Sequence, residues 1–236
     1  DHWNGWSQDI KVAIRKLRRD WTFTLLAVAV LALGIGANTA VFSIVNSVLL
    51  RPLAFGDPGR LVALEEVIPQ FSHLEPVLPV NARHFLQWKR DSQKLEDLAL
   101  LDPTEINLTG VSDPERLNGS RVTPNLFDVL RVRASIGRTF RPEDLREKVA
   151  VITDPLWRRQ FGASPSVVGT TIALDGVPHI VLGILPADFR DPIEPGVDAY
   201  VPWELHEDEW GWAGDHNYSS VARLRPGVTI SELLAE

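Results

Sequence analysis

The stretch Trp21–Leu50, WTFTLLAVAVLALGIGANTAVFSIVNSVLL, contains thirty consecutive residues without one charged side chain. In a chain of 236 residues of which 23% are charged, so long an uncharged run indicates a segment that avoids water. As an α-helix it would reach about 45 Å, which exceeds the hydrocarbon core of a bilayer at about 30 Å. We therefore predict a transmembrane helix at residues 21–50.

Two other interpretations of this stretch are weaker. A buried core helix of a soluble protein is seldom so long. A cleaved signal peptide would explain the basic flank and the apolar region Phe23–Ala37. However, apolar character resumes at Val41–Leu50, and no small-residue cleavage site is followed by polar sequence. A retained membrane anchor is therefore favoured.

The uncharged stretch also separates charge of opposite sign. Residues 1–20 carry five basic and three acidic side chains, a net of +2, and residues 51–236 carry 19 and 28, a net of −9. Because basic flanks stay on the cytoplasmic side, we expect the N-terminus in the cytoplasm and residues 51–236 outside.

Residues 1–20 are predicted to form a cytoplasmic amphipathic segment. Its apolar side chains recur at helical spacing opposite the basic ones, and they are Ile10, Ala13, Ile14 and Leu17. Such a helix is suited to lying along the lipid surface. A plain solvated helical turn is the alternative.

A stripe of small side chains runs along the predicted membrane helix. These side chains recur three or four residues apart, at Ala32, Gly36, Ala40, Ser43 and Ser47. Small residues let a second membrane helix approach closely. We expect the stripe to pack against helices outside this sequence, although Ala and Gly are also common in membrane helices by chance.

Residues 51–236 combine short strands with short helices, which is typical of an α+β domain. Strands are predicted at 61–67, 105–109, 116–122, 149–153, 170–174, 178–185, 199–202 and 219–224. Helices are predicted at 80–91 and 124–130, after Asp154 as N-cap, and from Ser231 onward. Asp175-Gly176 is the strongest hairpin signal. The predicted fold is one N-terminal transmembrane helix followed by a mixed α/β extracytoplasmic domain at residues 51–236.

The composition narrows the chemistry that this chain can perform. It has no Cys, which excludes disulfides, thiol catalysis and Cys-bound metals. No Walker A pattern is present, and Gly34-Ile35-Gly36 lacks the third glycine of a dinucleotide motif because Thr39 stands there. No nucleophile elbow is present either. We predict no enzyme activity and no cofactor, and the acidic outer domain argues against nucleic acid as a partner.

An acidic, aromatic stretch near the C-terminus is a candidate partner-docking loop, carried by Trp210, Trp212 and Tyr218. The alternative is an ordinary loop that places its Trp side chains in the core. The same stretch contains His206-Glu207-Asp208-Glu209 and Asp215-His216, which fit no metal motif, so we predict no metal site.

The chain contains a series of short motifs in a definite order. In and directly after the predicted membrane helix they are 23–26 (FTLL), 31–40 (LALGIGANTA) and 48–53 (VLLRPL). Beyond it they are 57–62 (DPGRLV), 107–110 (NLTG), 114–117 (PERL), 122–130 (VTPNLFDVL), 137–140 (GRTF), 156–162 (LWRRQFG), 168–169 (VG), 181–186 (VLGILP) and 222–229 (ARLRPGVT). In order and in sequence these motifs resemble the MacB-like/FtsX-like ABC transporter permeases, and most of all their duplicated orphan subgroup from acidobacteria.

This resemblance implies a permease subunit whose first helix leads into a large periplasmic core domain. It implies a place in the bacterial inner membrane, with a separate ABC ATPase subunit and further permease helices or a second permease copy as partners. The lipid bilayer is a partner already expected from the uncharged stretch 21–50. It also implies that the present chain is the N-terminal part of a longer protein, with the core domain truncated at its C-terminus.

In the relatives, ATP-driven motion serves efflux or mechanotransmission, and we expect the same coupling here. Two alternatives from other classes remain. One is a single-pass anchored binding or sensor module without an ATPase. The other is an anchored hydrolase, which the lack of any nucleophile or metal constellation disfavours.

Overall fold

The computed structural model describes residues 15–45, 55–69, 73, 76–111, 114–205 and 216–236. The chain divides into two compact units, Asp1–Pro52 and Leu53–Glu236. The first contains helix α2, and the second contains the strands and the shorter helices. Each unit is described by itself.

Helix α2 spans Trp21–Val45 and is 25 residues long. At 1.5 Å per residue it measures about 38 Å, enough to cross a hydrocarbon core. Among the described residues it is the one helix that is long and apolar enough to do so, over the window Trp21–Phe42. Residues 46–50 of the predicted span lie outside the described residues. The predicted limits of the cytoplasmic and membrane segments stay predictions.

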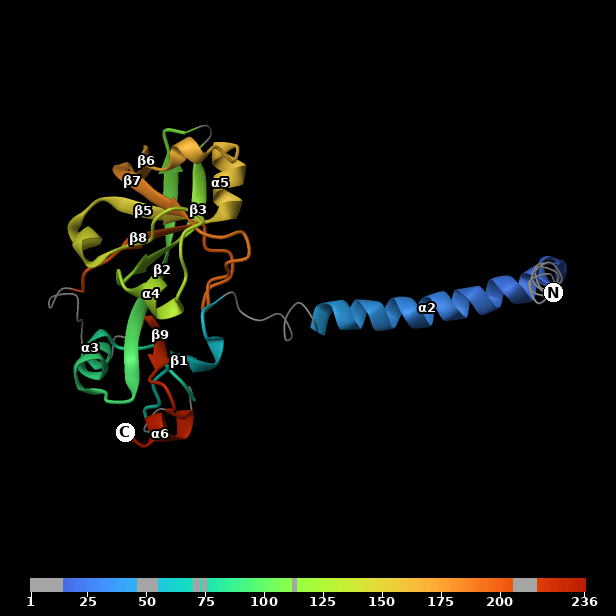
Figure 1. Cartoon of the computed structure of the whole chain (residues 1–236), viewed down its shortest axis with the longest axis horizontal. Coiled ribbons are helices and arrows are strands. Elements are labelled where there is room, and N and C mark those ends of the chain that lie inside the picture. Colours follow the sequence, from blue (N-terminus) through green and yellow to red (C-terminus); the bar gives the residue numbers. More distant parts are fainter. Residues whose placement is uncertain (1–14, 46–54, 70–72, 74–75, 112–113, 206–215) are drawn as a thin grey trace, which may run out of the picture. The chain divides into compact units, whose positions relative to one another are not determined.

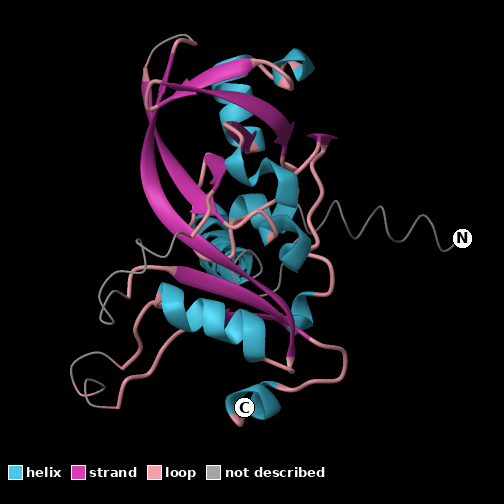
Figure 2. Cartoon of the chain, turned by 90° about the vertical axis from the view of Figure 1, so that its left-hand side faces the viewer, coloured by secondary structure: helices cyan, strands magenta, loops and turns pink. Residues whose placement is uncertain are grey.

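The second unit is built on a mixed sheet. Within the described part of the chain it has nine strands, in the order β1-β9-β2-β3-β8-β5-β7-β4, and β6 pairs with both β2 and β7. The strands are β1 Leu61–Leu64, β2 Leu95–Thr109, β3 Glu115–Val122, β4 Ile136–Gly137, β5 Val149–Ile152, β6 Thr171–Leu174, β7 Val177–Ile184, β8 Ala199–Pro202 and β9 Ser219–Leu224. Figure 2 shows these strands as one strongly curved layer.

Short helices cover this layer. The α-helices are α3 Ala82–Asp91, α4 Leu126–Leu130, α5 Asp154–Phe161 and α6 Ile230–Leu234, and the 3₁₀ turns are η2 Pro58–Arg60, η3 Pro142–Arg146 and η4 Pro165–Val167. A mixed α/β domain after one N-terminal apolar helix confirms the predicted fold class. The helix predicted at 124–130 is present as α4, in which the Phe127 and Leu130 side chains are buried.

The double pairing of β6 closes a ring of strands. The pairings run from β2 through β3, β8, β5 and β7 to β6 and back to β2. All six strands place side chains in one hydrophobic cluster, to which α5 adds Leu156 and Trp157. This ring forms one lobe of the domain, at the upper end of Figure 1.

Strand β2 links this lobe to the rest of the domain. It is 15 residues long and runs from beside α3 to beside β6 (Figure 1). Its N-terminal half has core on both faces: Leu98 and Leu100 lie in the cluster around α3, and Ala99 and Leu101 lie in the cluster around α4. Successive side chains of a strand point to opposite faces, so all four are buried.

The sequence predicted only residues 105–109 of this strand, because Pro103 interrupts the pattern. Residues 95–101 pair with β9, and residue 108 is the first to pair with β6. The Asn107 backbone is bonded to Asp175, on the side away from β3. Pro103 lies four residues before Asn107, and every second residue of a strand directs its backbone groups to the same side. The Pro103 nitrogen therefore faces away from β3, where no described strand pairs with residue 103. The missing N–H therefore breaks no ladder bond.

Two local predictions test turn and cap chemistry. Asp175 and Gly176 have φ of 49° and 76°, which confirms the predicted two-residue hairpin between β6 and β7. The predicted N-cap of α5 is wrong. Thr153 is the N-cap, and Asp154 is the first helical residue, where its carboxylate pairs with Arg158 one turn later at 2.7 Å.

Candidate functional site

Helix α2 exposes its apolar side chains along its length. Phe23 and Leu33 are each 74% exposed, and none of the window Trp21–Phe42 is buried inside the structure. An exposed apolar surface of this extent requires lipid or other helices around it.

The small-residue stripe lies on this helix. Ala32, Gly36 and Ala40 are exposed, and a Cβ added at Gly36 would meet no atom within 4 Å. Ser43 belongs to α2, and Ser47 lies outside the described residues. The room beside Gly36 suits a close helix neighbour, and the role of the stripe in helix packing stays a prediction.

The first described residues after α2, Phe55–Arg60, form what we call the junction segment. Phe55 is 6% exposed, and its ring meets the Phe189 ring edge-on at 6.2 Å between centroids. A Cβ at Gly56 would lie 2.8 Å from the Arg131 Cβ, so only glycine fits there. The junction segment is therefore part of the domain core and not a loose linker.

Two arginines fasten this segment from outside. Arg60 forms an ion pair with Glu96 of β2, and its Nε donates to the Leu224 carbonyl at 3.0 Å. Arg131, which follows α4, donates to the same Glu96 carboxylate at 3.3 Å and lies 3.7 Å from the Asp57 carboxylate. The paired charges join the segment to β2, α4 and β9.

A third arginine fastens it from inside. Arg223 of β9 is 1% exposed. Its Nε donates to the Val129 carbonyl at 2.7 Å, and its Nη1 donates to the Asp57 carbonyl at 3.0 Å. Its Nη2 has no hydrogen-bond partner among the described residues. We call Asp57, Arg60, Glu96, Arg131 and Arg223 the junction cluster.

The pKa of Glu96 and that of Arg223 are both lowered in this cluster, which favours the charged form of Glu96 and opposes that of Arg223. Burial would raise the pKa of Glu96, but hydrogen bonds and charges from Arg131 and Arg60 outweigh it and hold this pKa below its usual value. Burial lowers the pKa of Arg223, and the nearby Arg131 and Arg60 lower it further. An arginine nevertheless remains protonated in proteins, so Arg223 is a buried cation held by carbonyl dipoles.

The junction cluster was not predicted from the sequence. One signal was available, because Arg223 interrupts the apolar run Val221-Ala222-Arg223-Leu224 at a position that faces the core. The other members come from three separate segments, the junction segment, β2 and the residue after α4, and only the fold brings them together.

The structure describes one of the three predicted docking residues. Trp210 and Trp212 lie outside the described residues. Tyr218 pairs with Val80 through its backbone, and its ring packs on the Trp203 ring at 5.1 Å between centroids. Docking of a partner by this stretch stays a prediction.

The histidine and acidic residues of the same stretch are also mostly outside the described residues, with the exception of His216. The His216 Nδ1 lies 3.0 Å from the Pro79 carbonyl and 3.4 Å from the Glu66 carboxylate, which also lies 2.6 Å from His84. Over the described ranges, no group of three or more metal-ligating side chains has the geometry to hold an ion.

Comparison with known proteins gives the family. Residues 24–236 match the MacB-like periplasmic core domain. A 70-residue stretch is 36% identical to the macrolide export ATP-binding/permease protein MacB of Burkholderia thailandensis; it covers 29% of this chain and only 11% of that protein.

Solved structures agree on the fold. The periplasmic region of MacB from Actinobacillus actinomycetemcomitans superimposes with a TM-score of 0.56 at 12% identity, over 74% of this chain and 78% of that one. The extracellular domain of the noncanonic ABC-type transporter YknZ from Gram-positive bacteria gives 0.52 at 13% identity, over 74% and 87%. With the match over residues 24–236, the family resemblance is confirmed: the chain belongs to the MacB-like periplasmic core domain family of ABC-type transporter permeases.

Proposed function

We propose that this chain is the first membrane helix and the extracytoplasmic domain of a MacB/FtsX-type permease subunit. In this proposal it passes ATP-driven motion of a separate ATPase to the domain, for efflux or mechanotransmission. The observation that carries the proposal is the junction cluster. No residue of the chain is assigned covalent chemistry.

The junction cluster supports coupling of motion to the domain because it holds the chain firmly at Phe55–Arg60, the first described residues of the domain. Phe55 is buried, Gly56 is in close contact with Arg131, and Arg223 is bonded to the Asp57 backbone. A displacement of the chain at Phe55 therefore acts at once on β2, α4 and β9. A flexible linker would absorb the same displacement.

Sidedness and partners complete the proposal. The basic residues before Trp21 favour an N-terminus in the cytoplasm, in a bacterial inner membrane, with the acidic domain outside. The bilayer surrounds α2, and the small-residue stripe packs against further permease helices or a second permease copy. The ATPase acts from the cytoplasmic side.

Sidedness is tested with single cysteines, since the chain has none of its own. Ser7→Cys and Glu143→Cys are placed one at a time in the full chain in intact spheroplasts. A membrane-impermeant maleimide should label the cysteine at position 143 and leave the one at position 7 unlabelled until the membrane is permeabilised. The reverse pattern would overturn the architecture.

Coupling is tested by hydrogen–deuterium exchange on the full-length permease with its ATPase. ATP binding should change exchange in the junction segment and in β9. In the double variant Arg60→Gln/Arg131→Gln the change in β9 should be smaller, because only Arg223 then bonds the segment to β9. Arg133→Gln, which removes an exposed charge outside the cluster, should behave as wild type. A domain whose exchange does not respond to ATP would instead favour an anchored binding or sensor module.

A further inference from the structure

A cleft lies on the domain away from the junction cluster. It has a volume of about 560 Å³ and is formed by the ends of β3 and β8, by η3 with the start of β5, and by β7. Its lining includes the charged residues Arg121, Arg146, Glu147, Lys148 and Glu204, and the uncharged residues Leu145, His179, Val201, Pro202 and Trp203.

The charge of this lining differs from that of the domain. Residues 51–236 carry a net charge of −9, yet three lining residues are cationic and two are anionic. At physiological ionic strength charges farther away than about 8 Å are largely screened. A ligand in the cleft therefore responds mainly to these five nearby charges, three positive and two negative, and not to the acidic surface as a whole.

The three cations differ in their partners. Arg121 forms an ion pair with Asp102 and lies over the Trp203 ring at 4.9 Å. The Arg146 side chain is 84% exposed and lies 3.5 Å from the Glu204 carboxylate, an exposed pair that contributes little. Lys148 has no ion pair or side-chain hydrogen bond to any residue that the structure describes, so its charge is unmatched.

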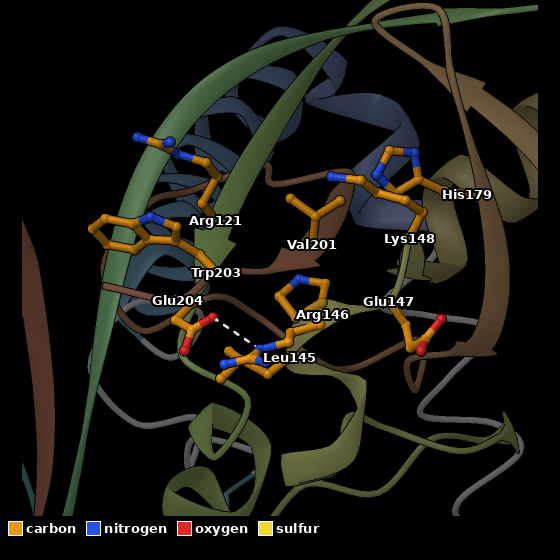
Figure 3. Close-up of a pocket in the computed structure, with 10 residues that line it drawn as sticks. Arg121, Leu145, Arg146, Glu147, Lys148, His179, Val201, Trp203 and Glu204 are labelled. Atoms are coloured by element: carbon orange, nitrogen blue, oxygen red, sulfur yellow. Dashed lines mark ion pairs between the residues drawn. The ribbon is translucent and has the colours of Figure 1, made fainter. Parts of the chain in front are cut away.

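Figure 3 shows how the side chains are arranged. Lys148 and the His179 ring lie together on one wall, and Arg121 with Trp203 lies on the opposite wall. Val201 lies between the walls, and the Arg146–Glu204 pair lies below. The cleft thus places a cation without a described partner beside the half-buried apolar side chains of Val201 and Pro202.

The pKa of the His179 ring depends in part on the Lys148 charge. Its Nδ1 donates to the Val177 carbonyl at 2.8 Å. Burial lowers the pKa of His179, and the positive charge of Lys148 lowers it further, against the hydrogen bond to Val177. Both effects disfavour the charged imidazolium of His179, whereas Lys148 is a cation on the same wall.

We propose that this cleft binds a small molecule that carries one anionic group, phosphate or carboxylate, on a compact apolar body. Lys148 pairs with the anionic group, and Arg146 turns from Glu204 to it. The apolar body packs on Val201 and Pro202, which are half-buried at the floor of the cleft. This site is independent of the coupling proposed above, since it uses none of the junction cluster.

The test uses the full chain in phosphatidylcholine nanodiscs and 1-naphthyl phosphate as the probe, with empty nanodiscs subtracted. Isothermal titration should give saturable binding to the wild type. Neutral 1-naphthol and inorganic phosphate should each bind at least about tenfold more weakly, because each lacks one half of the recognised chemistry. Equal affinity for either control compound, or no saturable binding of the probe, would overturn the proposal.

Variants locate the site. Lys148→Gln should weaken the probe at least about tenfold and Arg146→Gln about threefold. Arg133→Gln removes the same charge from an exposed position outside the cleft and should leave binding unchanged. Bound anion should also raise the pKa of His179, followed by NMR, because it offsets the Lys148 charge. Unchanged binding in folded Lys148→Gln, or a His179 pKa that saturation does not move, would contradict the assignment.

Discussion

Arg223 and Lys148 are both cations in an acidic domain, and their surroundings are opposite. Arg223 is 1% exposed, donates to two backbone carbonyls and lies beside the other charged residues of the junction cluster. Lys148 is exposed and has no partner among the described side chains. A buried cation with fixed acceptors holds segments together, whereas an exposed cation without an acceptor is free to take a ligand. Charge alone does not distinguish these roles; burial and partners do.

The largest expected effect is on folding. Arg223→Met keeps the volume but removes the donors to Val129 and Asp57, so we expect a loss of about 2–4 kcal/mol in the free energy of unfolding. Lys148→Gln should change it by less than about 0.5 kcal/mol. Urea unfolding of the chain in nanodiscs measures both.

Replacing buried ions by apolar side chains stabilises some proteins. A neutral or more stable Arg223→Met would therefore mean that Arg223 does not fasten the junction segment.

The second effect sharpens the role of close contact at the junction. Gly56→Ala places a Cβ 2.8 Å from the Arg131 Cβ, and we expect a loss of about 1–3 kcal/mol. Gly59→Ala, three residues later, meets no atom within 4 Å and is the matched control. Urea unfolding of both variants should separate them; equal stability would remove the argument for a tightly packed junction.

The third effect concerns the frame of the cleft. The Asp144 carboxylate binds Arg138 through two hydrogen bonds of 2.5 and 2.8 Å, and it holds the turn η3 that presents Arg146. These bonds lower the pKa of Asp144, so its stabilisation is present above the unfolded-state pKa of about 3.9 and is lost as pH falls through the lower, folded value.

Asp144→Asn should therefore lose about 1.5 kcal/mol at pH 7 and show a shallower fall in stability below pH 4 than the wild type. Urea unfolding between pH 2 and pH 7 measures this. If the free energy of unfolding falls below pH 4 as steeply in Asp144→Asn as in the wild type, Asp144 is not the cause of that fall.

The smallest effect is a titration shift without a ligand. Lys148→Gln removes the positive charge of Lys148, which lowers the pKa of His179, so this pKa should rise. NMR titration of the His179 ring follows it, with Arg133→Gln as control. A fall in the His179 pKa in Lys148→Gln, or a shift of the same size in Arg133→Gln, would mean that the Lys148 charge does not act on His179.

Local chemistry predicted much of the fold. Asp175-Gly176 needs only its own positive φ angles to turn the chain, and α4 follows from its apolar pattern. The first half of β2 was missed, because Pro103 is tolerated only where the neighbouring strands leave its nitrogen unpaired. That condition depends on β6 and β9, which are distant in sequence.

The two sites were less predictable than the strands. The small-residue stripe could be read from spacing alone, since helical periodicity is local. The junction cluster and the cleft each combine four or more segments, and their side chains are ordinary surface types such as Arg, Lys and Glu. Only Arg223, an arginine inside an apolar strand, carried a signal in the sequence.

Strand β2 has a mechanical consequence. At about 3.3 Å per residue its 15 residues extend about 50 Å, and they pair with β9 at one end and with β3 and β6 at the other. Antiparallel ladder bonds lie perpendicular to the strands, so tension along β2 loads many of them in shear together. We therefore expect the strand to resist stretching. A force applied near Glu96 would then be transmitted to the lobe around β6 by displacement of the whole strand.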